Sequence, residues 1–193
     1  MSRFFSLLSR MKYINRWGLM RNTRSENLSE HSLEVAILSH ALATLRNVRF
    51  GGRVSPERAA LLGIYHDAGE ILTGDLPTPI KYHNADIKIA YKSIEQVAAR
   101  RLLSALPADL RPAYAPLLGE PDPRDAELLP LVKAADKLSA LIKCLEEKQM
   151  GNTEFDKAAE TLRRQIDELA LPEADCFLNE FLPSYGLTLD ESV

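Results

Sequence analysis

Cysteine is scarce in this sequence, because its 193 residues include only Cys144 and Cys176. Two thiols at such separation form neither a disulfide framework nor a metal-binding pair of cysteines. The first ten residues contain an apolar run that is too short for a signal peptide or a membrane-spanning helix. These absences favour a cytoplasmic protein that does not act in a membrane.

The first 25 positions contain no acidic residue, so their charged side chains are all arginine or lysine. The net charge of the whole chain is −3, so no global attraction to a nucleic acid polymer or an anionic membrane is expected. A basic segment on an acidic protein favours a local anionic ligand. A solvated helix at this end of the chain is the alternative.

Apolar residues recur at helical spacings of three and four along most of the chain, and no segment shows the alternation typical of a strand. A Ser55-Pro56-Glu57 start signal marks one helix, because serine caps helices and proline suits their first turn. The sequence therefore predicts an all-α, single-domain helical bundle over residues 1–193. The expected helices are 2–12, 29–46, 55–72, 85–106, 124–149, 154–171 and 173–182.

Four residues with metal-binding chemistry occupy the inward register of these helices. His31 follows Leu28 by three positions, and His66 follows Leu62 by four. Asp67 is adjacent to His66. Asp136 follows Val132 by four positions, although a carboxylate in an apolar stripe needs a partner.

Two imidazoles and two carboxylates are a suitable set for one divalent transition metal. The absence of thiolate argues against a closed structural zinc site and suits manganese, cobalt, iron, nickel or zinc. Taken singly, each residue has an ordinary alternative: His31 as a hydrogen-bonded core residue, or Asp136 paired with Lys133 or Lys137. The metal hypothesis depends on all four residues acting together.

The sequence resembles the YfbR-type 5′-deoxynucleotidases, which belong to the HD superfamily of metal-dependent phosphohydrolases. The His…His-Asp…Asp order is the superfamily signature, and the surrounding residues make the resemblance more specific. The segments that carry it are Ile14–Trp17, Arg21–Asn22, Glu26–Leu33, Tyr65–Glu70, Leu72–Tyr82, Lys133–Asp136 and Lys143–Glu147.

This resemblance implies an HD-type fold with its metal-binding core in about residues 28–150. It also implies the metal ligands His31, His66, Asp67 and Asp136. Glu70 is expected to be catalytic, and either Glu70 or Asp67 is expected to manage the proton of the attacking water. Asp75 is expected to assist the departing nucleoside. Substrate contacts are expected from Arg16, Trp17, His31, Asp67, Asp75, Leu76, Pro77, Thr78 and Asp136.

Local chemistry agrees with several of these roles. Guanidinium binds phosphate through two parallel hydrogen bonds, and Trp17, the only tryptophan, offers a flat face to a base or sugar. Prolines on both sides of Thr78 stiffen the loop after the expected metal helix. The ordinary alternatives are a core Trp17 with a surface Arg16, a surface Glu70 paired with lysine, and a simple turn at Asp75.

The resemblance implies hydrolysis of deoxyribonucleoside 5′-monophosphates to deoxynucleoside and phosphate, with cobalt, manganese or another transition metal as cofactor. The protein is expected to form a homodimer and to bind neither a nucleic acid polymer nor a membrane. One rival interpretation keeps the metal but changes the substrate, giving a triphosphohydrolase, a cyclic-nucleotide phosphodiesterase or a two-iron oxygenase. The other is a non-catalytic helical binding module.

Overall fold

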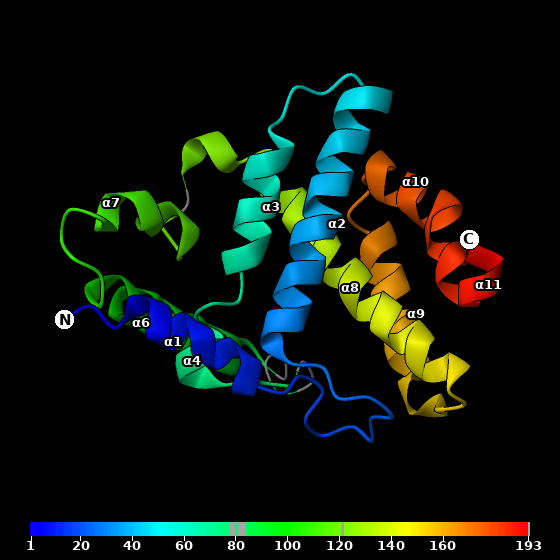
Figure 1. Ribbon diagram of the computed structural model, residues 1–193, viewed down its shortest axis with the longest axis horizontal. Coiled ribbons are helices and arrows are strands. Elements are labelled where there is room, and N and C mark those ends of the chain that lie inside the picture. Colours follow the sequence, from blue (N-terminus) through cyan, green and yellow to red (C-terminus); the bar gives the residue numbers. More distant parts are fainter. Residues whose placement is uncertain (78–79, 81–83, 121, 193) are drawn as a thin grey trace. The chain divides into compact units, whose positions relative to one another are not determined.

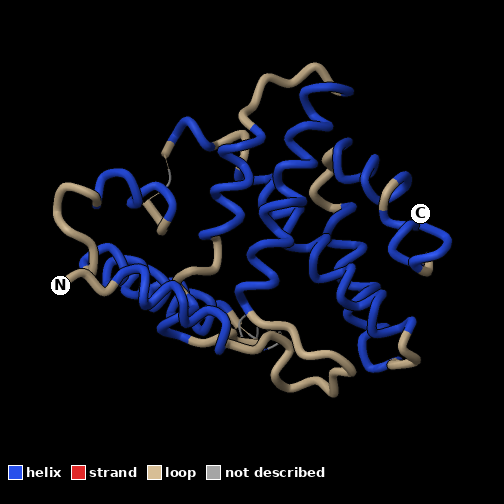
Figure 2. Tube along the Cα trace, in the orientation of Figure 1, coloured by secondary structure: helices blue, strands red, loops and turns tan. Residues whose placement is uncertain are grey.

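The computed structural model describes residues 1–77, 80, 84–120 and 122–192. Within these ranges the regular structure is helical, and extended pairing is limited to one antiparallel bridge between Asn15 and Asn27 (Figure 2). The α-helices are α1 (Phe4–Leu8), α2 (Leu28–Arg49), α3 (Pro56–Tyr65), α4 (Glu70–Thr73), α6 (Ala85–Ser104), α7 (Arg111–Tyr114), α8 (Leu129–Gln149), α9 (Asp156–Asp167), α10 (Pro172–Glu180) and α11 (Leu189–Ser192) (Figure 1). Short 3-10 helices join them: η1 (Ser9–Tyr13), η2 (Ala115–Leu117), η3 (Pro123–Asp125), η4 (Thr153–Phe155) and η5 (Leu182–Gly186).

The chain forms two compact units. Unit 1 consists of Met1–Met20, Ser25–Ser32 and Ile64–Asp125. Unit 2 consists of Arg21–Arg24, Leu33–Gly63 and Ala126–Val193. Each unit has buried apolar residues of its own, and the two are described separately.

Aromatic side chains form part of the core of unit 1. The ring of Phe4 is fully buried and meets the ring of Tyr114 edge to face, with 5.1 Å between the centroids. Tyr114 also lies 6.1 Å from the ring of Tyr65, again edge to face. Such pairs add a modest stabilisation to the burial of the rings themselves. They join the chain's start to the segment that ends α3.

Helix α2 begins at a reciprocal cap on Asn27. The Asn27 side chain accepts from the backbone N–H groups of Ser29 and Glu30, at 3.0 and 3.1 Å. The Glu30 carboxylate accepts in return from the Asn27 N–H at 3.2 Å. This arrangement satisfies backbone donors that a helix start leaves without partners. The cap fixes the first turn of α2, which carries His31.

The predicted helix over 55–72 is wrong in its last part, because α3 ends at Tyr65 and His66–Gly69 form a turn. The Ser55 cap itself is confirmed, since its hydroxyl accepts from the Arg58 N–H at 3.0 Å. Adjacent residues on an α-helix do not face each other. The turn removes that constraint, so the side chains of His66 and Asp67 can point to one place.

Helix α8 is the main element of the core of unit 2 and packs against α9 (Figure 1). Its residues Leu131, Leu138 and Ile142 are almost completely buried. The helix starts at Leu129 and not at 124 as predicted, because Pro123–Asp125 form a 3-10 turn and Pro130 occupies the first turn of α8. Its end is as predicted, with Gly151 in the left-handed region at φ 79°.

The other helix limits differ from the predictions by a few residues. The predicted helix 2–12 becomes 3-10 from Ser9 onward, and α6 ends two residues before position 106. The predicted helix 154–171 is α9 preceded by η4, and the predicted helix 173–182 is α10. None of the helices in the described part of the chain combines the length and the apolarity needed to cross a membrane.

Gly63 lies where α3 comes close to α2 within unit 2. A Cβ atom on Gly63 would stand 2.9 Å from the Cα of Ala36 and 3.0 Å from its backbone nitrogen. We expect Gly63→Ala to lower the free energy of unfolding by about 1–3 kcal/mol, because backbone atoms cannot yield as a side chain can. Denaturant unfolding measures this change. Gly18→Ala is the control, since nothing lies within 4 Å of its Cβ position, and equal stability of the two variants would contradict the prediction.

Candidate metal centre and nucleotide site

Three of the four predicted metal ligands lie together in unit 1. His66 Nε2 is 3.0 Å from Asp67 Oδ2, and His31 Nε2 is 3.7 Å from the same oxygen. The two imidazole rings meet at an angle of 61° with 5.2 Å between their centroids. His31 comes from the first turn of α2, whereas His66 and Asp67 come from the turn after α3. Two ring nitrogens and a carboxylate oxygen therefore point toward one volume.

The donor set of these three residues fits a divalent transition metal. Their ligand atoms lie within 4.8 Å of one another, and His31 is fully buried. Burial alone would raise the pKa of Asp67, but the charge and hydrogen bond of His66, with His31 and Arg16, lower it below its ordinary value. The carboxylate is thus ionised at neutral pH. Imidazole nitrogens together with a carboxylate suit manganese, cobalt or zinc.

Asp136, the fourth predicted ligand, lies on α8 in unit 2. Its side chain is half-buried, and Lys133 and Lys137 flank it on the same helix. Burial lowers the pKa of Lys137, and the negative charge of Asp136 opposes this lowering. Its part in a metal centre remains a prediction.

The segment before α2 carries Arg16 and Trp17. It is held beside residues 26–28 by backbone hydrogen bonds, from Arg16 N–H to the Glu26 carbonyl at 3.0 Å and from Leu28 N–H to the Ile14 carbonyl at 2.9 Å. Trp17 has a φ of 58°, which is unusual for a residue with a side chain. Such backbone strain costs about 1–3 kcal/mol and concentrates at functional sites. The surrounding hydrogen bonds therefore hold the backbone of Trp17 in a conformation that it would not adopt by itself.

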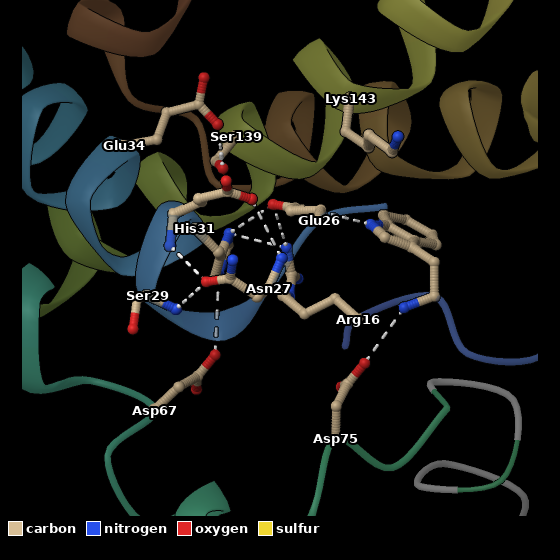
Figure 3. A network of polar contacts seen from close by, with 12 residues as sticks. Arg16, Glu26, Asn27, Ser29, His31, Glu34, Asp67, Asp75, Ser139 and Lys143 are labelled. Atoms are coloured by element: carbon tan, nitrogen blue, oxygen red, sulfur yellow. Dashed lines mark hydrogen bonds and ion pairs between the residues drawn. The ribbon is translucent and has the colours of Figure 1, made fainter. Parts of the chain in front are cut away.

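Glu26 is at the centre of the polar contacts in this part of unit 1 (Figure 3). It accepts from Arg16 Nη1 at 3.1 Å and from Trp17 Nε1 at 2.9 Å. One of its oxygens lies 3.5 Å from His31 Nδ1. Burial would raise the pKa of Glu26, but the nearby His31 and the charge of Arg16 lower it below its ordinary value. Glu26 is therefore an ionised acceptor for Arg16 and Trp17, and His31 Nδ1 lies close to one of its oxygens.

Arg16 also contacts His31 directly. Its Nη1 atom lies 2.7 Å from His31 Nδ1. The Arg16 side chain is only 12% exposed, which does not match the alternative of a surface arginine. Its guanidinium also lies 5.8 Å from the centroid of the Trp17 ring. The predicted phosphate-binding residue is thus joined to a predicted metal ligand and to the only tryptophan.

Asp75 meets the same segment from the loop after α4. Its carboxylate accepts from the Trp17 backbone N–H at 3.3 Å (Figure 3). Burial raises the pKa of Asp75 above its ordinary value, and the nearby charge of Asp67 adds to this rise, whereas Arg16 opposes it. A raised pKa means that this carboxyl group keeps its proton to a higher pH than an exposed aspartate does. The structure thus brings Asp75 to Trp17.

Glu70 begins α4 and is buried, with 7% of its surface exposed. The alternative of a surface glutamate therefore does not apply. Its backbone N–H donates to the Asp67 carbonyl at 2.9 Å, which fixes Glu70 one turn beyond the ligand pair. His66 and Asp67 lie in the turn before α4, so they and Glu70 do not share a face of the helix predicted over 55–72.

Leu76 and Pro77 are half-buried and follow Asp75 in the same loop. Thr78 lies outside the described residues, so its predicted substrate contact stays a prediction. Glu26 begins one of the segments that carry the family resemblance, Glu26–Leu33, but the sequence predicts no role for it. The available signal was a carboxylate placed just before the helix cap that precedes His31. Its three partners depend on the path of the loop, which spacing does not reveal.

Comparison with known proteins places this site in a family. Residues 3–185 match the profile of the 5′-deoxynucleotidase YfbR-like family. The 5′-deoxynucleotidase of Erwinia tasmaniensis is 53% identical over 98% of this chain and 96% of its own length. The 5′-deoxynucleotidase YfbR of Escherichia coli is 52% identical over 98% of this chain and 95% of its own length.

Solved structures share the helical fold. An HD-domain phosphohydrolase from Listeria innocua has a TM-score of 0.81 and 23% identity, over 95% of this chain and 88% of its own. An HD phosphohydrolase of cyanophage S-2L, bound to dA and one catalytic Zn²⁺ ion, has a TM-score of 0.65 and 20% identity, over 93% and 96%. The fold is thus that of the HD-domain phosphohydrolases, and the chain belongs to the YfbR-like 5′-deoxynucleotidase family.

Proposed function

We propose that this protein hydrolyses deoxyribonucleoside 5′-monophosphates to a deoxynucleoside and inorganic phosphate, using one divalent transition metal. The observation that carries the proposal is the convergence of His31, His66 and Asp67 next to Arg16. A cation site beside a half-buried guanidinium suits a phosphate monoester. Family membership supports the same activity, since relatives about half identical over nearly their whole length are 5′-deoxynucleotidases.

The proposed metal ligands are His31, His66, Asp67 and Asp136. Asp136 is included because of its place in the HD-family signature and its half-buried position on α8. When bound, the cation supplies a Lewis acid that polarises a phosphoryl oxygen and makes a water molecule more acidic. Cobalt, manganese and zinc all suit this donor set. The cyanophage relative with its zinc ion supports a single-metal centre.

The protein's own residues then divide the work of hydrolysis. Arg16 binds the phosphate, and the Trp17 ring packs against the sugar, where it leaves no room for a 2′-hydroxyl. Glu70 takes the proton of the water whose oxygen attacks phosphorus. As the bond from phosphorus to the 5′-oxygen breaks, Asp75 donates a proton to that oxygen. The raised pKa of Asp75 supports this role. Leu76, Pro77 and Thr78 are the remaining proposed substrate contacts.

The rival phosphohydrolases differ in their substrates. A triphosphate requires further cationic side chains near Arg16, and a second metal requires further inward histidines. The sequence contains only four histidines, and His40 and His83 have no assigned role. The family match also favours the monophosphate. The convergence of His31, His66 and Asp67 argues against a non-catalytic binding module that has lost its metal.

Phosphate release from dAMP, dCMP, AMP, dATP and cyclic AMP, measured side by side, tests the proposal. We expect both deoxynucleoside monophosphates to be hydrolysed and AMP, dATP and cyclic AMP to be much poorer substrates. Equal rates on dAMP and AMP would contradict the role of Trp17. A preference for dATP or cyclic AMP would replace the proposed activity with one of the rivals. The proposed homodimer and cytoplasmic location are separate expectations that this assay does not test.

A further inference from the structure

The contacts of His31 impose a choice between two tautomers. Arginine carries only hydrogen-bond donors, so the 2.7 Å contact from Arg16 Nη1 to His31 Nδ1 uses the lone pair of Nδ1. In that tautomer the ring hydrogen is on Nε2. However, Nε2 is the nitrogen that lies 3.7 Å from Asp67 and points to the ligand cluster. His31 can therefore accept from Arg16 or bind a cation through Nε2, but not both.

Glu26 has the position needed for the second state. A histidine that binds a cation through Nε2 carries its hydrogen on Nδ1, and that hydrogen needs an acceptor. The Glu26 carboxylate lies 3.5 Å from Nδ1, and it already accepts from Arg16 and Trp17. The same carboxylate can therefore accept from His31 once Arg16 withdraws (Figure 3).

We propose that Glu26 is a positioning residue that couples cation binding at His31 to the placement of Arg16 and Trp17. With a cation held at Nε2, the ring hydrogen of His31 would lie on Nδ1 instead of Nε2, and Nδ1 would donate it to Glu26. Arg16 then loses its contact with His31, and the hydrogen that pointed to Nδ1 can be donated to a phosphate. This inference rests on the proposed function, because it takes His31 as a metal ligand and Arg16 and Trp17 as substrate contacts. It predicts that the metal binds before the nucleotide.

The single tryptophan gives a direct readout of this coupling. Trp17 Nε1 donates to Glu26 at 2.9 Å, so a shift of the carboxylate toward His31 changes the surroundings of the indole. Because the chain contains no other tryptophan, its intrinsic emission reports on Trp17 alone. Zn²⁺ is the suitable probe, since its filled d shell has no redox chemistry. The measurement needs no nucleotide and no turnover.

The test is a Zn²⁺ titration of chelated protein, following Trp17 emission and, separately, Zn²⁺ affinity by competition with a chelator. In the wild type, we expect the emission to change with the same midpoint as Zn²⁺ occupancy. In Glu26→Gln, the amide cannot accept from both Trp17 and His31, so the emission response should be lost. Its Zn²⁺ affinity should fall about 10- to 100-fold, as for other residues that orient a ligand. Glu26→Asp keeps the charge on a shorter side chain and should recover part of the affinity.

Glu30→Gln is the matched control. It removes one carboxylate four residues away, and glutamine still serves in the helix cap that Glu30 completes. The inference would be overturned if Glu26→Gln kept the wild-type Zn²⁺ affinity, or if Glu30→Gln lost as much Zn²⁺ affinity as Glu26→Gln. It would also be overturned if Zn²⁺ did not change the Trp17 emission of the wild type. If Glu26→Gln does not fold, the wild-type titration and Glu26→Asp still decide. Failure to hydrolyse dAMP would instead count against the proposed function and leave this titration unaffected.

Discussion

Asp67→Asn is expected to abolish metal-dependent hydrolysis of dAMP. The Asp67 carboxylate is one of the two proposed carboxylate ligands, with His66 Nε2 at 3.0 Å and His31 Nε2 at 3.7 Å. A neutral amide of the same shape binds a divalent cation much less well. Because a bound metal contributes several kcal/mol to such a reaction, and about 1.4 kcal/mol is tenfold in rate, kcat/KM should fall by about 10³-fold or more. Phosphate release at fixed metal concentration measures the loss.

A second readout distinguishes loss of metal from loss of fold. Excess Zn²⁺ should raise the Tm of the wild type, because it binds the folded state, and should leave the Tm of Asp67→Asn nearly unchanged. Asp109→Asn is the control, since Asp109 is an exposed aspartate outside the site. Asp109→Asn should retain both activity and the Zn²⁺ effect. Near wild-type activity in Asp67→Asn, with Zn²⁺ still raising its Tm, would remove Asp67 from the metal centre.

Glu70→Gln should lower kcat by about 10²- to 10⁴-fold, the usual effect of removing a general base. Glu70 is buried at the start of α4, one turn beyond His66 and Asp67. Glutamine fills nearly the same volume but cannot take a proton from water. We therefore expect kcat to fall while KM for dAMP and Zn²⁺ affinity stay close to wild type. Steady-state kinetics and chelator competition on the same preparation measure these quantities.

The split between kcat and metal affinity identifies the role of Glu70. If Zn²⁺ affinity falls together with kcat, Glu70 holds the metal and is not the proposed base. If kcat is unchanged, another group takes the proton, and Asp67 would be the next candidate. Glu120→Gln, at an exposed position outside the site, is the control for loss of one negative charge. It should retain wild-type kinetics.

The helical class and the register of the long helices could be predicted because burial follows periodicity. Leu28, Leu38 and Leu42 of α2 are nearly completely buried, and His31 is fully buried in the same stripe. The Ser55 cap is also visible in sequence, because its hydroxyl bonds a backbone donor three residues later. These features depend only on neighbours along one helix.

The turn at His66–Gly69 could not be predicted in the same way. The turn contains no proline, and its one poor helix former, Gly69, is tolerated inside helices at a cost of about 1 kcal/mol, so local preference does not place the end of α3 at Tyr65. The chain nevertheless breaks the helix there, and the break brings His66 to Asp67. Local preference is often overridden where a functional site requires it.

The contacts of Glu26 could not be predicted from the sequence either. Its contacts join residues ten, nine and five positions away, through a loop in which Trp17 takes a positive φ. Loop paths of this kind are set by tertiary contacts rather than by residue spacing. The family resemblance supplied the identities of the site residues, but only the structure gives the contacts among His31, Arg16 and Glu26.

The central claim is that a cation at the His–Asp cluster is required for hydrolysis of deoxynucleoside monophosphates. Phosphate release from dAMP by chelated protein, before and after Co²⁺, Mn²⁺ or Zn²⁺ is returned, tests it most directly. We predict negligible release after chelation and recovery with at least one of these metals in the wild type, but not in Asp67→Asn. Undiminished release from fully chelated protein would contradict the claim.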